Sequence, residues 1–404
     1  MSSRAAPLRT PWQRRIIEAG TCALVGVVAA VAGERLPAAI ATAALGAGIL
    51  GASQLLAWAA DAAEVDLSGR LVIMVVVLIA ALPELTVELQ LAYTRQAQLV
   101  TANLTGATRL LLTAATALPA LGAVLARSRG QTVTPTAPNQ GRRLDLAVLT
   151  LAALCALTIV ARGKLTLTEA AILGALYILY VARGRGAEND QPATVGVAAH
   201  LAALEPATRK RLCGILLVGA ALAVLIVARA FPEELLSAGR SAGVDPYLLI
   251  QSIIPLFTET PELVVAATLV LNKRPAQGTS LLLASSVTQS TLVLASTSVA
   301  YLAGGGGSIL PLAGRERVEM LLTTATTLMA VAALATLRPE RIDGWIMTAA
   351  FGLETLFPNW QLRLAVAITL LTFAADILVS RRRHLLSIAA AVPQSLRPPR
   401  DADG

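Results

Sequence analysis

Two Pro-Glu-Leu tripeptides, each inside a long apolar stretch, carry the carboxylates with the clearest chemical meaning in this sequence. Residues 81–93 read ALPELTVELQLAY, and residues 259–271 read ETPELVVAATLVL. A proline inside a helix removes one backbone hydrogen bond and displaces the carbonyl group four residues earlier. An exposed carbonyl oxygen beside a carboxylate suits a hard cation such as Ca²⁺, which binds about 6–8 oxygens. The pattern therefore predicts cation-binding oxygens at Glu84 and Glu262.

A second glutamate accompanies each tripeptide. Glu88 lies four residues after Glu84, and Glu259 lies three residues before Glu262, so each pair is expected on one helix face. The carbonyl oxygens that the prolines would free belong to Ile79 and Phe257. In lipid such a break is tolerated where the backbone faces protein or water. We therefore expect Glu84 and Glu262 to meet near the middle of the membrane, with Glu88 and Glu259 supplying further carboxylates.

Polar side chains in the two following apolar stretches are expected to complete the ligand set. Arg109 lies in the first of these stretches, and we expect it either to pair with Glu84 or Glu88 and tune the charge of the site, or to prevent metal binding. Glu84 and Glu262 are expected to carry protons as well as metal. The expected additional ligands are Asn103, Thr108, Ser285, Ser286 and Gln289, with the hydroxyls of Thr105 and Thr288 nearby.

The composition indicates a membrane protein. Of 404 residues, 55% are hydrophobic and only 14% are charged, and the mean hydropathy is +0.68. Apolar runs of about 18–25 residues can cross a hydrocarbon core, and in lipid they do so as helices. The sequence thus predicts an all-α, polytopic transmembrane helical bundle with about 11–12 spans. The candidate runs are about 16–33, 37–60, 70–93, 98–126, 144–161, 166–182, 212–230, 246–271, 276–303, 317–337, 341–357 and 362–380.

The net charge of +8 indicates orientation rather than nucleic-acid binding. With the N-terminus inside, most of the 33 basic residues fall in loops on the cytoplasmic side, as the positive-inside rule expects. We predict an integral, multi-pass protein of a bacterial-type plasma membrane, with both termini cytoplasmic. Membrane lipid and transported cations are the expected partners, no nucleic acid is expected, and the oligomeric state stays open. No enzyme signature is found, so neither catalysis nor a cofactor is expected.

The two tripeptides belong to a longer internal repeat. Pro83 matches Pro261 at an offset of 178 residues (261 minus 83), and Arg95 matches Lys273 at the same offset. The charge distribution places the first hinge outside and the second inside, which predicts two inverted repeats, a frequent plan among transporters. The expected organisation is an N-terminal segment with an extra span at 1–36, a first repeat half at 37–182, a cytoplasmic linker at 183–211, a second half at 212–357, and an extra C-terminal span with a basic tail at 358–404.

These residues resemble the calcium:cation antiporter superfamily, which includes the sodium/calcium and proton/calcium exchangers. Its signature is a Pro-Glu or Ala-Glu motif in one kinked helix and a Gly-Ser motif in the next, once in each half. Here PEL at 83–85 is followed by ANLTGAT at 102–108, and PEL at 261–263 is followed by ASSVTQ at 284–289. The segment ASSVTQ is similar to the corresponding segment in the second repeat of the proton-coupled branch. The resemblance implies an inverted-repeat transporter without a cofactor, in which the matched glutamates bind the cation.

Departures from the family pattern bear on the coupling ion. Ala107 and Leu111 stand where the family usually has polar residues, which disfavours Na⁺. The leading expectation is a secondary active antiporter that exchanges a cation, Ca²⁺, for H⁺ rather than Na⁺. Two alternatives stay open. One is a transporter of another solute on the same scaffold, with Arg109 recognising an anion or zwitterion. The other is a non-transporting membrane protein with a degenerate exchanger fold.

Overall fold

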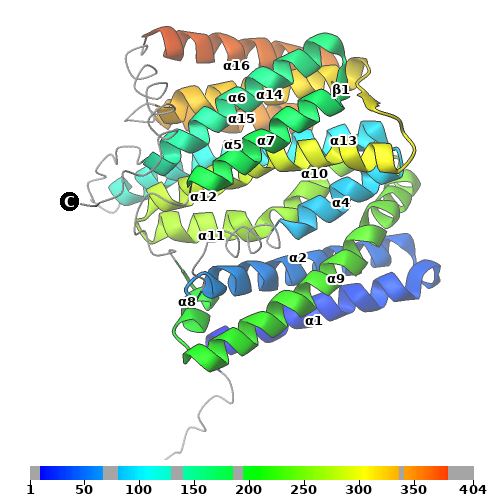
Figure 1. Ribbon diagram of the computed structural model, residues 1–404, viewed down its shortest axis with the longest axis vertical. Coiled ribbons are helices and arrows are strands. Elements are labelled where there is room, and N and C mark those ends of the chain that lie inside the picture. Colours follow the sequence, from blue (N-terminus) through cyan, green and yellow to red (C-terminus); the bar gives the residue numbers. More distant parts are fainter. Residues whose placement is uncertain (1–9, 67–80, 129–139, 185–193, 336–340, 381–404) are drawn as a thin grey trace, which may run out of the picture. The chain divides into compact units, whose positions relative to one another are not determined.

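The computed structural model describes residues 10–66, 81–128, 140–184, 194–335 and 341–380, which are almost entirely helical (Figure 1). The apolar run before Pro83 falls largely outside the described residues, as does Ile79.

Alanine and leucine dominate the described helices, and both residues favour helix. The helices are α1 (Pro11–Ala32), α2 (Ala38–Ala63), α4 (Leu82–Tyr93), α5 (Ala97–Ser128), α6 (Gln140–Arg162), α7 (Leu167–Gly184), α8 (Val197–Ala202), α9 (Pro206–Ser241), α10 (Pro246–Thr258), α11 (Thr260–Leu271), α12 (Pro275–Thr288), α13 (Leu294–Ala303), α14 (Gly314–Ala335), α15 (Arg341–Leu356) and α16 (Trp360–Ser380), with a 3₁₀ turn η1 (Gly33–Arg35), a π-helix η2 (Gln289–Val293) and strands β1 (Lys164–Thr166) and β2 (Ile309–Pro311).

The helix lengths confirm a polytopic membrane bundle. Eight helices of the described residues are long and apolar enough to cross a membrane, or nine if the bent pair α10 and α11 forms one span. The predicted spans at 166–182 and 341–357 form α7 and α15, which are not among these eight. The predicted span at 70–93 is described only from residue 81 onward, where it forms α4.

The chain divides into two compact units, the first comprising residues 1–87 and 190–244 and the second residues 88–189 and 245–404. In the first unit α1, α2 and α9 pack against one another. Gly26 and Gly48 allow the close approach of α1 and α2, since a Cβ on either would lie 2.5 Å from the Cα of the other.

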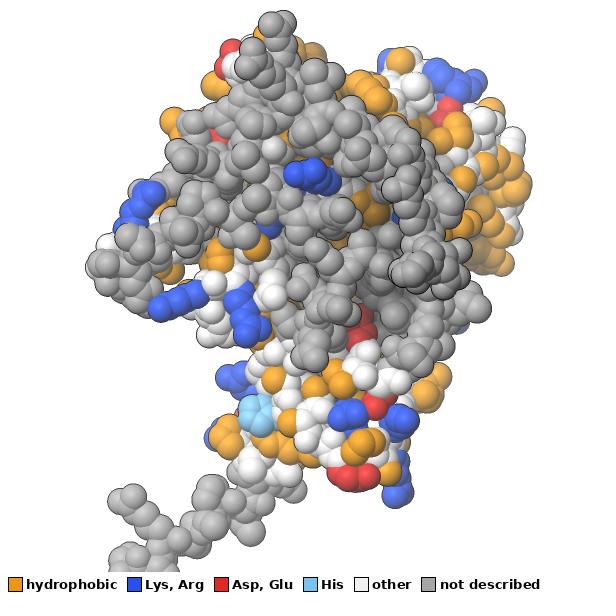
Figure 2. All heavy atoms as spheres, turned by 60° about the vertical axis from the view of Figure 1, so that its left-hand side comes forward, with side chains coloured by type: hydrophobic (Ala, Val, Ile, Leu, Met, Phe, Trp, Pro, Cys, Tyr) orange, Lys and Arg blue, Asp and Glu red, His pale blue; other side chains and the backbone are white. Residues whose placement is uncertain are grey.

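One end of the first unit is polar. Trp12 stacks on His200 of α8, with ring centroids 6.1 Å apart. Arg209 Nε donates to Asp66 Oδ2 at 2.7 Å, and this hydrogen bond lowers the pKa of Asp66 below its ordinary value. Figure 2 shows this end of the unit, where basic side chains lie around the histidine. The end therefore carries the kind of charge that faces water rather than lipid.

Helix α14 forms the centre of the second unit. In its most apolar stretch 83% of the residues are buried, more than in any other candidate span of the described residues. It packs against α5, α6 and α16 (Figure 1). Leu322, Ala325 and Met329 of α14 join one apolar cluster with residues of α5, α6, α12 and α16. Because this helix contacts so many others, a polar group on it faces protein rather than lipid.

The internal repeat is visible in the backbone. Helices α4 and α11 begin 178 residues apart (260 minus 82), as do α5 and α12 (275 minus 97). Between them, Arg95 and Lys273 both adopt the left-handed conformation, with φ of 63°. In each hinge the amide of the following residue bonds the carbonyl five residues back, at 3.0 Å for Gln96 to Leu91 and 2.8 Å for Arg274 to Leu269. Both are Schellman endings, so the sequence repeat is also a structural repeat.

The predicted break at the second tripeptide is confirmed. Helix α10 ends at Thr258 and α11 begins at Thr260, and the two axes are bent by 55°. Pro261 is the second residue of α11, a position where a missing amide hydrogen is tolerated. Pro83 is likewise the second residue of α4. Each tripeptide therefore lies at the start of a helix, and at the second one the preceding helix ends just before it.

Gly106 makes the contact between α5 and α10 possible, because a Cβ there would lie 1.9 Å from the carbonyl oxygen of Gln251. We predict that Gly106→Ala lowers the free energy of unfolding by about 2 kcal/mol or more, because the contact is with backbone. Gly352→Ala is the matched control, since no atom of the described residues is found within 4 Å of the position of its Cβ. Denaturant titration of the purified protein measures both, and equal effects would contradict the close approach.

Candidate cation site

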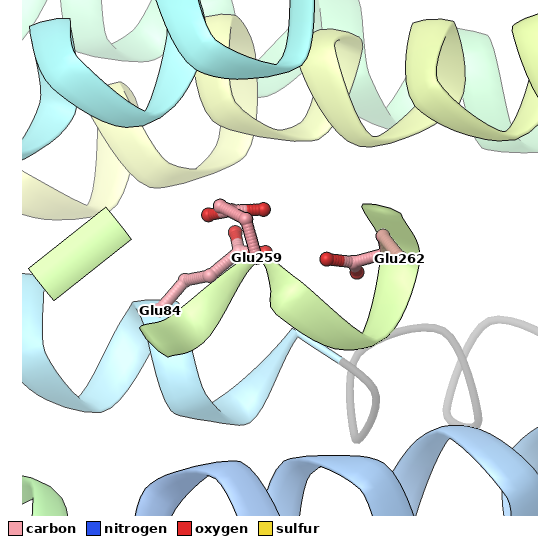
Figure 3. Close-up of side chains that lie close together, drawn as sticks. All are labelled: Glu84, Glu259 and Glu262. Carbon is pink, nitrogen blue, oxygen red and sulfur yellow. The ribbon is translucent and has the colours of Figure 1, made fainter. Parts of the chain in front are cut away.

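Three glutamates meet at the two helix starts. Glu84, Glu259 and Glu262 each place one carboxylate oxygen within 4.8 Å of the others (Figure 3). Glu84 and Glu259 are buried, and Glu262 is half-buried. Glu84 falls at the edge of the first unit, but it lies on α4, which continues without a break into the second. The structure thus brings together the two glutamates that the repeat matched, Glu84 and Glu262, and adds Glu259.

Helix geometry favours acidic groups at this place. Glu84 and Glu262 are each the third residue of a helix, directly after the proline. The amino-terminal turn of a helix has unpaired amide groups and a partial positive charge, which stabilise a carboxylate. Glu259 lies at the break between α10 and α11. Two helix starts and one helix end therefore converge on the three carboxylates.

Two amide side chains hold site carboxylates. Gln289 of the π-helix donates through Nε2 to Glu259 Oε1 at 2.9 Å. Asn103 of α5 donates through Nδ2 to Glu88 Oε2 at 2.8 Å, and Thr297 contacts Glu88 Oε1 at 3.3 Å. Glu88 is fully buried but is not a member of the three-carboxylate group. Asn103 and Gln289 are therefore placed to orient carboxylates, and their predicted contacts with metal stay predictions.

The predicted hydroxyl ligands are engaged within their own helices. Thr108 donates to the carbonyl of Leu104 at 2.9 Å, and Ser286 donates to that of Leu282 at 2.7 Å. Ser285 is half-buried on α12. Each hydroxyl that donates in this way keeps its oxygen lone pairs as acceptors. Their role as ligands stays a prediction.

The expected pairing of Arg109 with Glu84 or Glu88 is wrong. Arg109 NH1 lies 2.7 Å from Glu319 Oε2, and its Nε lies 2.9 Å from Glu354 Oε1. All three side chains are almost completely buried. Because Arg109 is held by two carboxylates of α14 and α15, this geometry argues against its recognising an anionic solute.

Sequence reasoning missed the rest of this buried network. Arg363 of α16 also pairs with Glu319, and it donates to Gln251 Oε1 at 3.0 Å. Sequence reasoning assigned no role to Arg363, which lies at the start of the predicted run 362–380 and is only 2% exposed. Two arginines and two glutamates therefore balance one another. The network could have been suspected from the sequence, because the last three apolar runs contain both acidic and basic residues, and charges inside a membrane need partners.

Comparisons with known proteins agree with this architecture. The family model described as "Sodium/calcium exchanger protein" matches residues 37–183. A crystal structure of the H⁺/Ca²⁺ exchanger CAX is similar with a TM-score of 0.87 and 30% identity, over 96% of this chain and 99% of that one. The structure of native YfkE is similar with a TM-score of 0.63 and 13% identity, over 85% and 98%. The structure of the sodium-calcium exchanger NCX_Mj soaked with Na⁺ and Sr²⁺ is similar with a TM-score of 0.51 and 15% identity, over 85% of this chain and 99% of that one. At this identity the similarity shows likeness of fold alone. No curated protein sequence matches the chain.

The fold and these similarities define a polytopic membrane protein of the exchanger class, built from two inverted repeats. The chain belongs to the calcium:cation antiporter superfamily and is closer to its proton/calcium exchanger branch.

The buried network predicts a strong coupling between Arg109 and Glu354. Arg109→Met and Glu354→Met should each lower the free energy of unfolding by about 3–5 kcal/mol, because each leaves a buried charge without its partner. The double variant should lose at least about 2 kcal/mol less than the sum of the two single losses. Unfolding of the purified variants in a denaturant titration measures the cycle, and additive losses would contradict the pairing.

Proposed function

We propose that this protein is a secondary active antiporter that exchanges Ca²⁺ for H⁺ across the membrane. The observation that carries the proposal is the meeting of Glu84, Glu259 and Glu262 at two helix starts. Carboxylates this close repel one another when all are ionised, and either a divalent cation or protons relieve the repulsion. A single site that takes either Ca²⁺ or protons makes exchange obligatory.

The donor set fits Ca²⁺ as the substrate. Three carboxylates supply up to six oxygens, and Ca²⁺ binds about 6–8 oxygens in flexible geometry. Glu84 and Glu262 bind the cation in this proposal, and Glu259 adds the third carboxylate. Glu88, Asn103, Thr108, Ser285, Ser286 and Gln289 support the site from the surrounding helices.

H⁺ is the proposed coupling ion rather than Na⁺. The similar exchanger with 30% identity is described as an H⁺/Ca²⁺ exchanger. In the first repeat, Ala107 and Leu111 offer no oxygen where the family usually has polar side chains. Protons need only the carboxylates, whereas Na⁺ needs additional oxygen ligands.

We further propose that both termini are cytoplasmic. Contacts within the second unit support the assignment of loops to sides. Strand β1 pairs with β2. This pairing joins the loops that follow the predicted runs 144–161 and 276–303, and both loops lie outside when the N-terminus is inside. Arg142 donates to the carbonyl of Ala276 at 3.1 Å. This bond joins the loop before the predicted run 144–161 to the start of the run 276–303, and both lie inside when the N-terminus is inside. Access would alternate by movement of helices around the helix starts that hold the carboxylates.

A transport assay tests the proposal. In proteoliposomes, an imposed pH gradient should drive ⁴⁵Ca²⁺ uptake, and an imposed Na⁺ gradient alone should not. Glu262→Gln should reduce the uptake by at least about 100-fold, because the amide cannot alternate between metal and proton. Glu233→Gln is the control, since this glutamate is exposed on α9, and it should transport as the unmodified protein does.

Two results would contradict the proposal. Normal uptake by Glu262→Gln would show that this carboxylate is not part of the site. Uptake driven by the Na⁺ gradient but not by the pH gradient would show that Na⁺ is the coupling ion.

A further inference from the structure

A small cavity lined by hydroxyls lies inside the second unit, apart from the three carboxylates. Its volume is about 30 Å³, which is enough to hold a water molecule. Helices α5, α6, α13 and α14 enclose it, together with the π-helix η2. Its polar lining is made of Thr105, Thr108, Ser290, Thr323, Thr324 and Thr327.

The hydroxyl hydrogens of this lining are already used. A threonine hydroxyl has one hydrogen to donate, and five of the six residues donate it to a carbonyl of their own helix. On α14, Thr324 donates to Met320 at 2.7 Å, and Thr327 donates to Thr323 at 2.8 Å. On α5, Thr108 donates to Leu104. The same holds for Thr105 and Thr323. The cavity therefore presents mainly oxygen lone pairs, which need a donor.

Water fits this lining better than a metal ion does. Among the residues that the structure describes, no carboxylate lines the cavity. The guanidinium of Arg109 lies 3.5 Å from the hydroxyl of Thr323, and its positive charge disfavours a second cation nearby. A water molecule needs about two to four polar partners and donates two hydrogens. The lining supplies such partners from several helices.

A larger cavity of about 540 Å³ lies at the start of α14, lined by Arg315, Glu319, Trp360 and Arg363 among others. Trp360 is 55% exposed, so the cavity reaches the surface of the unit. Arg363 Nε is buried and has no hydrogen-bond acceptor among the described residues. The charged side chains of its lining suit water.

One layer of side chains lies between the two cavities. Glu319 lines the larger cavity and accepts from Arg109 at 2.7 Å and from Gln251 Nε2 at 2.9 Å. Arg109 in turn reaches Thr323, and Gln251 donates to Thr105 at 3.3 Å. Both of these hydroxyls line the small cavity. The layer therefore separates two polar spaces along one helix.

We propose that the small cavity is an internal water site, and that the two cavities form a water path along α14 that delivers protons to the exchanger. The inner site lies beside Ser290, which follows Gln289, the residue that bonds Glu259. A proton passes from water in the larger cavity through the Glu319 carboxylate of the layer to water in the small cavity, and then to a site carboxylate, so no other reactant is needed. The water site stands on the cavity alone, and its role as a proton path rests on the proposed function.

X-ray footprinting with mass spectrometry tests the water site directly, since radicals formed from bound water oxidise adjacent side chains. Met320 lines the small cavity. Met329 lies on the same helix in the apolar cluster, and both are buried. Met320 should oxidise at least about fivefold faster than Met329. Equal rates would overturn the water site, and so would protection of Met320 that rises with Na⁺ concentration, which would indicate a cation instead.

Paired variants test the path. Thr324→Val with Thr327→Val removes two acceptors with little change in shape, and should lower Met320 oxidation to the rate of Met329. The control is Thr326→Val, a buried threonine of α14 that lines neither cavity. The double variant should slow pH-driven ⁴⁵Ca²⁺ uptake at least about fivefold while keeping thermal stabilisation by Ca²⁺.

The outcomes separate the two proposals. Unchanged uptake in the double variant, with its Met320 no longer oxidised, would overturn the proton path. Loss of Ca²⁺ stabilisation in the double variant would also overturn it, because the threonines would then act on cation binding. If the unmodified protein showed no uptake, the proposed function would fail, and the labelling would still decide the water site.

Discussion

Negative charge collected inside an apolar bundle is the constraint on which the rest of the structure depends. Three carboxylates within 4.8 Å are costly in a low-dielectric interior. Two features of the chain reduce that cost. Glu84 and Glu262 follow prolines at helix starts, where backbone amides and the helix dipole favour an acid. Glu259 accepts a hydrogen bond from Gln289. What remains of the repulsion is an affinity for protons or for a cation, which is the property that an exchanger needs.

The second buried charge group answers a different requirement. Arg109, Arg363, Glu319 and Glu354 neutralise one another within the second unit. Arg109 lies on α5, the helix that also carries Asn103, and its partners lie on α14 and α15. The pairs therefore fix the register of a helix that borders the site. This arrangement keeps the positive charge of Arg109 engaged with its own counter-charges, while the cation site retains its acidic character.

Much of the fold could be predicted from the sequence, because the patterns that specify it are local or repeated along the chain. Apolar run length predicted the bundle, and the constant offset between Pro83 and Pro261 predicted a repeat that reappears as matched hinges at Arg95 and Lys273. The meeting of Glu84 with Glu262 followed from the pseudosymmetry of that repeat. The break at Glu259 followed from the chemistry of proline.

Other features depended on packing that no local signal carries. Arg109 and Glu319 are 210 residues apart in sequence, and their pairing exists only because α5 and α14 pack together. The repeat does not help to predict this pairing, since Val287 stands at the position that matches Arg109. The ligand roles of the hydroxyls could not be fixed either, because a threonine in a helix bonds its own backbone whether or not it lines a site.

Calorimetric titration of the purified protein with Ca²⁺, in buffers of different ionisation enthalpy, tests the central claim most directly. If the same carboxylates hold either protons or the cation, Ca²⁺ binding must release protons. The account predicts binding with a release of at least about one proton per Ca²⁺ near neutral pH. Binding without proton release would contradict it, because protons and Ca²⁺ would then occupy different groups.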